Sequence, residues 1–170
     1  MSEVVKINYK LRVYLDTSVI SYLEQEDAPE KMEDTRLLWT ALKSGKHDIY
    51  ISDIVIAEIM RCDENKRNVL LEHLAEIDYT LIETDDKIVD LAEKIIDFGV
   101  LKKKSFEDCQ HIAAAILNNC DIITSWNFKH IVNVKTIKGI KILTTAEGYK
   151  DLMIYPPTAL LEEDEENDRT

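Results

Sequence analysis

Three carboxylates, Asp16, Glu58 and Asp108, occupy positions at which an acidic side chain can serve chemistry rather than solubility. Asp16 directly follows the alternating run at 11–15, which predicts a strand, and open parallel sheets bind ligands beyond the carboxyl ends of their strands. Glu58 lies within the apolar run 54–60, typical of a buried helix, where a carboxylate is costly unless it is paired or bound to a cation. Asp108 lies off the apolar stripe of its predicted helix, so it can face a cleft. An acidic site that recruits metal cations would also suit the net negative charge of the chain.

Each of these residues also has a purely structural interpretation, which the sequence leaves open. Asp16 can cap the helix that follows it. Glu58 can be a buried acid satisfied by an arginine or by backbone donors. The pattern Ser105-x-x-Asp108 matches a capping box, in which the acid bonds back to the cap amide. The segment 124–127 ends a predicted strand and points at the same sheet edge as Asp16, or it is a simple turn with an Asx-type bond from Asn127.

The elements that must position these side chains alternate between strands and helices. We predict strands at 11–15, 48–51, 79–82, 121–124 and 141–143. We predict helices after 16–18 and over 29–43, 52–61, about 64–77, 105–118 and 128–132. A further helix begins at the cap Thr84, and a closing helix runs from Thr144 or Thr145 toward Met153. This order predicts an α/β sandwich around a mostly parallel sheet. We expect a single domain over 1–155, ended by Pro156-Pro157, and an acidic, disordered tail over 156–170.

The charge of the chain bears on its partners. The 170 residues carry a net charge of −12, of which the segment 162–170 contributes −5 and the rest −7. A protein held on nucleic acid mainly by non-specific phosphate contacts is usually basic, so this class is disfavoured. No run approaches the roughly 18 apolar residues of a membrane helix, the N-terminus has no signal-like apolar region, and three cysteines do not make a disulfide framework. We therefore expect a cytoplasmic protein with reduced thiols.

Four segments, taken in order, resemble the PIN domain, the fold of many bacterial and archaeal toxin ribonucleases of the VapC type. They are Tyr14–Ile20, Ser52–Ile59, Phe106–Ala115 and Asp121–Ile131. Each is weak alone, but the four at these separations and on these elements are specific. The resemblance runs from Val13 to about Leu152 and implies a three-layer α/β/α sandwich with a short, mostly parallel central sheet.

The resemblance also implies the residues of the site. Asp16, Glu58 and Asp108 match the three core acidic positions, which implies binding of Mg²⁺ or Mn²⁺. Asn127 falls where many members have a fourth acid, and its amide can hydrogen-bond a metal-bound water but cannot add charge. This departure bears on a second metal and on full activity. The form Trp126-Asn127-x-Lys129-His130 marks a recognisable subgroup of the family.

The residues expected to contact the substrate flank this acidic set. They are Thr17, Ser125, Lys104 and Lys129. The lysines are expected to hold backbone phosphates, and the structural alternative for the run 102–104 is a solvated loop.

The function implied is a metal-dependent endoribonuclease that hydrolyses RNA phosphodiester bonds and acts as the toxin of a toxin–antitoxin pair. A cognate antitoxin and a second copy of the chain are the implied partners. Hard cations can polarise phosphate oxygens and lower the pKa of bound water, which suits this reaction.

Two other functions and one other metal are alternatives to this interpretation. One is a catalytically silent PIN module that binds RNA or protein. A haloacid dehalogenase-type phosphatase needs a second Asp where this chain has Ser18. Zinc is disfavoured because Cys109, His111 and Cys120 have no metal-ligand spacing.

Overall fold

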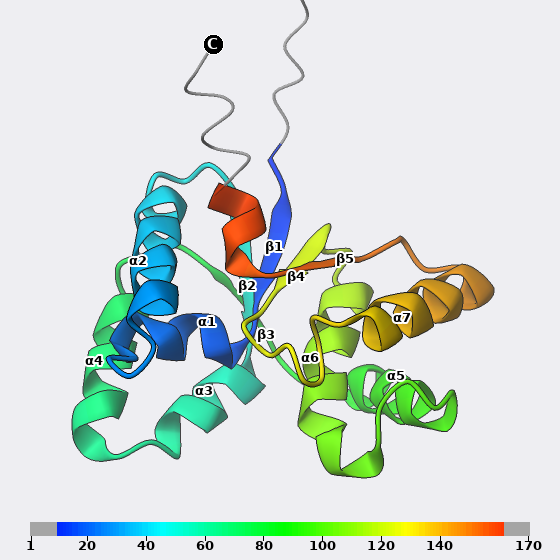
Figure 1. Ribbon diagram of the computed structural model, residues 1–170. Coiled ribbons are helices and arrows are strands. Elements are labelled where there is room, and N and C mark those ends of the chain that lie inside the picture. The colour runs from blue at the N-terminus through cyan, green and yellow to red at the C-terminus, as the bar shows by residue number, and fades with distance from the viewer. Residues whose placement is uncertain (1–9, 162–170) are drawn as a thin grey trace, which may run out of the picture.

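The five short strands of the protein form one parallel sheet with the order β3-β2-β1-β4-β5. The computed structural model describes residues 10–161. Its strands are β1 (Arg12–Leu15), β2 (Asp48–Ser52), β3 (Thr80–Ile82), β4 (Ile122–Thr124) and β5 (Met153–Tyr155), and every neighbouring pair is parallel. Helices cover both faces of the sheet, as Figure 1 shows. The predicted α/β/α sandwich is therefore confirmed.

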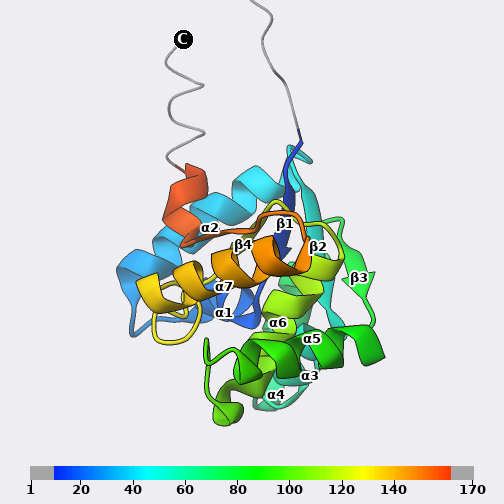
Figure 2. The same ribbon diagram turned by 90° about the vertical axis from the view of Figure 1, so that its right-hand side faces the viewer.

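The central strand β1 is buried on both of its faces, as expected of a parallel sheet with two helical layers. Val13 and Leu15 point to one face and Tyr14 to the other, and all three are 0% exposed. The first face packs against α1 (Thr17–Ser21), α2 (Pro29–Lys43), α3 (Asp53–Met60) and α4 (Glu64–Leu74). The second packs against α5 (Asp86–Asp97), α6 (Phe106–Leu117) and α7 (Val134–Glu147), which face the viewer in Figure 2.

The order of the strands reverses between β1 and β4. The chain runs from β1 outward through β2 to β3, and then returns to the other side of β1 for β4 and β5. Ligands of such sheets bind where the order reverses, beyond the carboxyl ends of the strands. Two short 3₁₀ helices, η1 (Tyr22–Glu24) and η2 (Lys103–Ser105), complete the surroundings, and η2 leads directly into α6.

The end of the domain differs from the prediction. Residues 141–143 lie inside α7 rather than in a strand, the last strand is β5, and residues 128–132 form turns instead of a helix. Ile140 and Leu143 are buried and Ile142 is 55% exposed, a helical pattern in which the apolar run wraps around α7. Asn133 fixes the start of this helix by accepting a hydrogen bond from the Thr136 amide, and Gly148 ends it with a φ of 75°.

Two predicted caps also differ. Helix α5 is capped by Asp85, not Thr84, because the Asp85 carboxylate accepts the amide of Ile88 at 2.9 Å. The Ser105 side chain makes no cap hydrogen bond at the start of α6, so no capping box with Asp108 forms. Asp108 therefore does not take part in capping the start of α6.

Beyond Pro156, residues 157–161 are helical and Leu160 is buried in the core on the α1–α4 side of the sheet. These residues pack with the domain that we predicted to end at 155. The remainder of the predicted tail, 162–170, lies outside the described residues. Within the part of the chain that is described, no helix combines the length and the apolar character needed to cross a membrane.

Candidate active site

Asp16 stands at the carboxyl end of β1 with both of its carboxylate oxygens fixed. It accepts hydrogen bonds from Ser18 Oγ at 2.5 Å and from Ser125 Oγ at 2.9 Å, and it is 4% exposed. The Ser18 hydroxyl also accepts the Trp126 amide, and the Ser125 hydroxyl accepts the Asn127 amide. Because each serine oxygen is already an acceptor, its own proton is directed to Asp16.

This arrangement decides between the two interpretations of Asp16. Its side chain makes no hydrogen bond to the amides of α1, so it does not act as a cap. Burial raises the pKa of Asp16, while His111 and the two serine hydroxyls act in the opposite direction. A buried carboxylate oriented in this way is suited to bind a cation rather than to start a helix.

Glu58, on α3, is held by His111, a residue that the sequence connects only with the disfavoured zinc site. His111 Nε2 lies 2.7 Å from Glu58 Oε1, and His111 Nδ1 lies 2.7 Å from the Tyr14 hydroxyl. That hydroxyl lies 2.8 Å from Ser52 Oγ at the end of β2. His111, Tyr14 and Ser52 are all buried. Helix α3 is less buried than its apolar run predicts, because only Val55 and Ile59 are buried and the Glu58 side chain is 27% exposed. The carboxylate nevertheless has a partner, which is neither an arginine nor the backbone.

The four groups form a chain that stays satisfied in either charge state of the imidazole. With a neutral ring, Nε2–H donates to Glu58, Nδ1 accepts from Tyr14, and Tyr14 accepts from Ser52. With an imidazolium, Nδ1–H donates to Tyr14, which then donates to Ser52. Burial lowers the pKa of His111, but the hydrogen bond to Glu58 and the surrounding carboxylates outweigh it, so the pKa is raised overall.

Asp108 is tied to the strand-end segment through Asn127. The Asn127 side-chain oxygen accepts the His130 amide at 2.9 Å, which is the predicted Asx-type turn and fixes which end of the amide is the oxygen. The amide nitrogen therefore faces Asp108 and donates to its Oδ1 at 3.3 Å. Asn127 acts here as a hydrogen-bond donor to an acid. Burial raises the pKa of Asp108, with His111 and His130 acting against it.

The three acids share one electrostatic environment. The carboxylates of Asp16, Glu58 and Asp108 all act on His111, and Glu58 acts on the other two. Within residues 10–161, however, no three His, Cys, Asp or Glu side chains are close enough to hold a metal ion as they stand. Asp108, held by a single long hydrogen bond, is the side chain best able to turn.

The donor chemistry of this rim fits a hard divalent cation. Over the described residues, neither Asp16 nor Asp108 has a lysine or arginine ion-pair partner. The hydroxyl of Thr17, next to Asp16, is buried and has no hydrogen-bond partner within 10–161. Carboxylate and hydroxyl oxygens are the ligand types that Mg²⁺ and Mn²⁺ prefer, and the His111 ring bonded to Glu58 is a neighbouring group that can carry a positive charge.

The residues expected to contact substrate divide into two groups. Ser125 is 0% exposed and its hydroxyl is engaged by Asp16 and the Asn127 amide, so it supports Asp16 from within. The Thr17 hydroxyl is also buried. Lys104 and Lys129 are exposed and line one hollow, together with His130. The burial of Ser125 points to a supporting role, and its direct contact with substrate stays a prediction.

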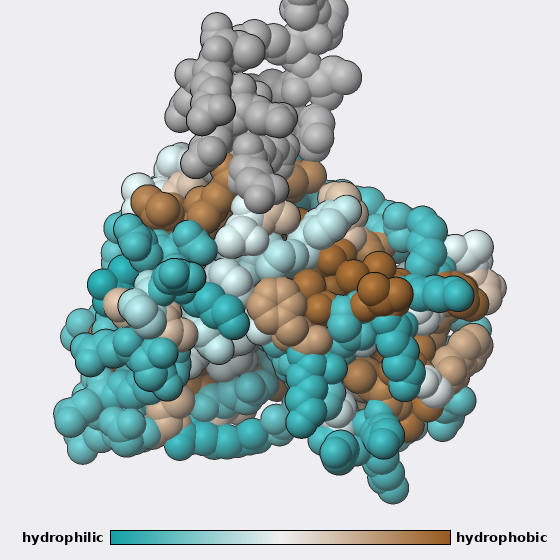
Figure 3. Space-filling model, viewed as in Figure 1, coloured by the Kyte–Doolittle hydropathy of each residue, from teal (hydrophilic) through white to brown (hydrophobic). Residues whose placement is uncertain are grey.

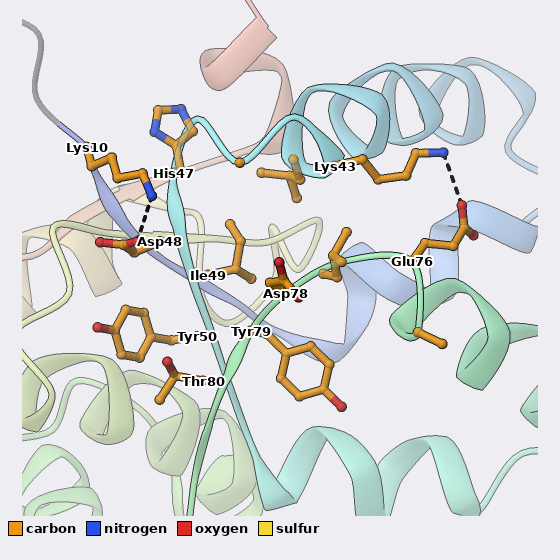
Figure 4. Close-up of a pocket in the computed structure, with 14 residues that line it drawn as sticks. Lys10, Lys43, His47, Asp48, Ile49, Tyr50, Glu76, Asp78, Tyr79 and Thr80 are labelled. Carbon is orange, nitrogen blue, oxygen red and sulfur yellow. Dashed lines mark hydrogen bonds and ion pairs between the residues drawn. The ribbon is translucent and has the colours of Figure 1, made fainter.

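A different hollow, of about 470 Å³, opens at the other end of β2, near Asp48 (Figure 4). Lys10 pairs with Asp48 at 3.3 Å, and Lys43 with Glu76 at 3.0 Å. Because ion pairs occupy these charges and the hollow lies away from the carboxyl ends of the strands, it is not a candidate active site.

The zinc alternative also fails in the structure. Burial raises the pKa of both Cys109 and Cys120 to about 12, so forming the thiolates that zinc would need is costly at these positions. His111 uses both ring nitrogens in the hydrogen bonds described above. A signal for its real position was present, because His111 follows Asp108 by three residues and so lies one turn further along the same helix.

Comparisons with known proteins place this geometry in a family. The family model of the PIN domain matches residues 13–127, a range that includes Asp16, Glu58, Asp108 and Asn127. No curated protein matched the chain.

Two solved structures are similar to the chain. VapBC2 from Rickettsia felis, bound to a DNA fragment from its promoter, has a TM-score of 0.52 at 15% identity over 86% of this chain and 98% of that chain. VapC20 from Mycobacterium tuberculosis, a Sarcin-Ricin loop cleaving toxin, has a TM-score of 0.50 at 14% identity over 69% of this chain and 92% of that chain. These likenesses show the fold, and the family match covers more than half of the sequence: the chain belongs to the PIN domain family.

Proposed function

We propose that the protein is a metal-dependent endoribonuclease that hydrolyses RNA phosphodiester bonds, and that it is the toxin of a toxin–antitoxin pair. The observation that carries this proposal is the buried Asp16 carboxylate, whose two oxygens are oriented by Ser18 and Ser125. It shares its environment with Glu58 and Asp108, the other acids of the family pattern. Membership of the PIN domain family and the likeness to VapC20, a Sarcin-Ricin loop cleaving toxin, support the assignment.

Asp16, Asp108 and Glu58 would hold the cation. When bound, Mg²⁺ or Mn²⁺ would neutralise charge on the phosphate and lower the pKa of a coordinated water. The chain orients its own groups for this task. The serines fix Asp16, Asn127 donates to Asp108, and His111 takes one oxygen of Glu58 and leaves the other without a hydrogen bond within the described chain.

The proposed partners are a cognate antitoxin and a second copy of the chain, and the proposed location is the cytoplasm. Free cysteines are consistent with a reducing compartment. Exposed apolar side chains gather over α7 and β5, where Figure 3 shows a brown surface beside teal ones. They include Val134 (81% exposed), Ile142 (55%) and Tyr155 (47%). A surface of this kind suits a protein partner.

A silent RNA- or protein-binding PIN module is the second candidate. It is favoured by one observation, namely that Asn127 replaces an acid and donates a hydrogen bond to Asp108. A cation bound by Asp108 must compete with that contact. The silent module predicts RNA binding without RNA cleavage.

Incubation of the purified protein with a generic single-stranded RNA and Mn²⁺ separates the two. We expect endonucleolytic fragments from the wild type and none from Asp16→Asn or from a reaction with EDTA. An uncleaved RNA in the wild-type reaction, or equal cleavage by the Asp16→Asn protein, would refute the nuclease proposal.

A further inference from the structure

A hollow of about 220 Å³ lies at the start of α6, where Ser105 lines it, and it is lined by four lysines and by no acidic residue. Lys102 and Lys104 come from the segment that leads into α6, Lys129 from the loop after β4, and Lys135 from the first turn of α7. Segments far apart in the sequence thus bring four positive charges to one place. This set is called the lysine pocket below.

The lysines of this pocket have no carboxylate partners. Within residues 10–161, the ammonium group of none of the four takes part in an ion pair or a hydrogen bond. Lysines elsewhere do pair with acids: Lys10, Lys43, Lys94, Lys141 and Lys150. The chain has 33 acidic and 21 basic residues, so acidic partners are abundant. Four unpaired cations that repel one another around a hollow are suited to an anion that comes from outside.

The backbone of the pocket is held in place by its own hydrogen bonds. The Ser105 amide donates to the Lys102 carbonyl at 2.8 Å, which fixes the turn of η2. The Asn133 side-chain amide donates to the carbonyls of Phe128 and Lys129 while its oxygen caps α7. The backbone that carries the lysines is therefore ordered, and only the flexible ends of their side chains lose conformational freedom when a ligand binds.

The pocket adjoins the acidic rim. His130 lines it, and the His130 amide bonds to Asn127, whose side chain donates to Asp108. The last residue of η2, Ser105, also lines the pocket and precedes Asp108 by three residues. A polyanion that reaches the acids from this side passes over the lysines.

Neighbouring features set limits on the ligand. Lys103, between Lys102 and Lys104, lines a separate hollow with the acids Glu93 and Asp97. The lysine pocket contains no Phe, Tyr or Trp on which a base can stack. Its chemistry is that of phosphate contacts, which position a nucleic acid without selecting its sequence.

We propose that Lys102, Lys104, Lys129 and Lys135 bind backbone phosphates of single-stranded RNA that flank the bond to be cleaved. The proposal rests on the function proposed above. It adds that the substrate approaches the acidic rim along α6 and the loop after β4. It also explains how a chain of net charge −12 holds a polyanion.

The test is the salt dependence of RNA binding. A fluorescent single-stranded RNA is titrated with the Asp16→Asn protein in EDTA, so that no cleavage occurs, across a series of salt concentrations. In the same background, the double variant Lys104→Ala/Lys129→Ala removes two pocket charges. The matched control Lys87→Ala/Lys103→Ala removes two exposed charges that do not line the pocket.

Each phosphate contact on a single strand contributes about 0.7 to the slope of log K against log salt. We therefore expect the pocket variant to lose about 1.4 of slope and roughly 25-fold in affinity at 0.1 M salt, while the control stays within about twofold. Equal binding by the pocket variant, or an equal loss in the control, would overturn the pocket whatever the cleavage assay shows. Lysine-dependent binding by a wild-type protein that cleaves nothing would instead refute the nuclease and leave the pocket in place.

Discussion

The Tyr14 hydroxyl occupies the middle of the buried chain between Ser52 and His111, and His111 in turn holds Glu58. A carboxylate on an exposed helix would sample many orientations. Here one oxygen of Glu58 is fixed by a ring that is itself fixed on its other side. The position of this acid thus depends on residues that never reach the solvent.

Removing the hydroxyl oxygen of Tyr14 tests how much this series of hydrogen bonds contributes to the stability of the fold. Tyr14→Phe leaves two buried polar groups, on Ser52 and His111, without that partner, and an unsatisfied buried group costs about 1–3 kcal/mol. We expect the free energy of unfolding, measured in urea, to fall by about that amount. The matched control is Tyr155→Phe, whose ring is 47% exposed and whose hydroxyl has no hydrogen bond within the described chain. Equal stability of Tyr14→Phe and wild type would contradict the hydrogen-bonded chain.

The charge state of His111 gives a pH prediction. Its pKa in the folded protein is raised above the ordinary value of 6.5, so the stability it contributes is full below 6.5 and is lost as the pH rises through the folded pKa. Between about pH 6.5 and 8 in EDTA, we expect the free energy of unfolding to fall, by at most about 1.4 kcal/mol per pH unit for one proton. The His111→Gln protein should lack this slope. A wild-type stability that is flat or rises over this range would contradict the assignment.

Much of this site could be foreseen from residue types and positions. Asp16 lies at the rim that its strand end predicts, Asp108 lies off the core stripe of its helix as expected, and Glu58 has a partner although its helix is less buried than predicted. The identity of that partner could not be foreseen, because it depends on how α3 packs against α6 across the sheet edge. The partner of the Ser125 hydroxyl could not be foreseen either, since sequence shows that a hydroxyl is near a site but not which group it bonds to.

In helix α7 the local sequence pattern and the tertiary packing favour different secondary structures. The run at 141–143 has β-branched and apolar residues typical of a strand, yet Lys141 and Ile142 face outward and Leu143 faces the core. The three-residue strand β5 completes the sheet instead, with only Ile154 buried. Strands as short as this carry almost no periodic signal, whereas the longer α2 and the α5 stripe were predicted within a residue or two.

The start of α5 provides an element-scale test. Asp85 accepts the amide of Ile88 at 2.9 Å, and loss of such a cap costs about 1 kcal/mol. We expect Asp85→Ala to lower the free energy of unfolding by about that amount in chemical denaturation. Lys87→Ala, two residues on and exposed, is the control and should change little. If Asp85→Ala is as stable as wild type, the hydrogen bond at this helix start does not stabilise the fold.

At the scale of the whole molecule, charge is divided between two neighbouring surfaces. The chain carries −12 overall, and its acids include the buried Asp16 and the half-buried Asp108. The lysine pocket beside them is locally positive. We expect this arrangement to disfavour an anionic strand on the acidic parts of the surface and to favour its approach over the lysine pocket. The acidic composition thus excludes general nucleic-acid binding without excluding a nucleic-acid substrate.

Metal binding should stabilise the whole fold, because it relieves carboxylates that burial makes costly to ionise. At a hundredfold excess over its dissociation constant, a ligand contributes about 2.7 kcal/mol, or a rise in Tm of roughly 5–10 °C for a chain of this size. We expect Mn²⁺ to produce such a rise in the wild type and a much smaller one in Asp16→Asn. Asp78→Asn, at the opposite end of the sheet, should respond like wild type. An unchanged melt of the wild type at saturating Mn²⁺ would argue against a metal at the rim.

The most direct measurement is anomalous scattering from crystals of the wild-type protein grown or soaked with Mn²⁺. We expect a manganese peak in contact with the carboxylates of Asp16 and Asp108, with Asp108 turned away from Asn127, and no peak at that position in crystals of Asp16→Asn. Manganese found only at other surfaces, with Asp16 still bonded to its two serines alone, would contradict the claim that these separate acids act as one cation site.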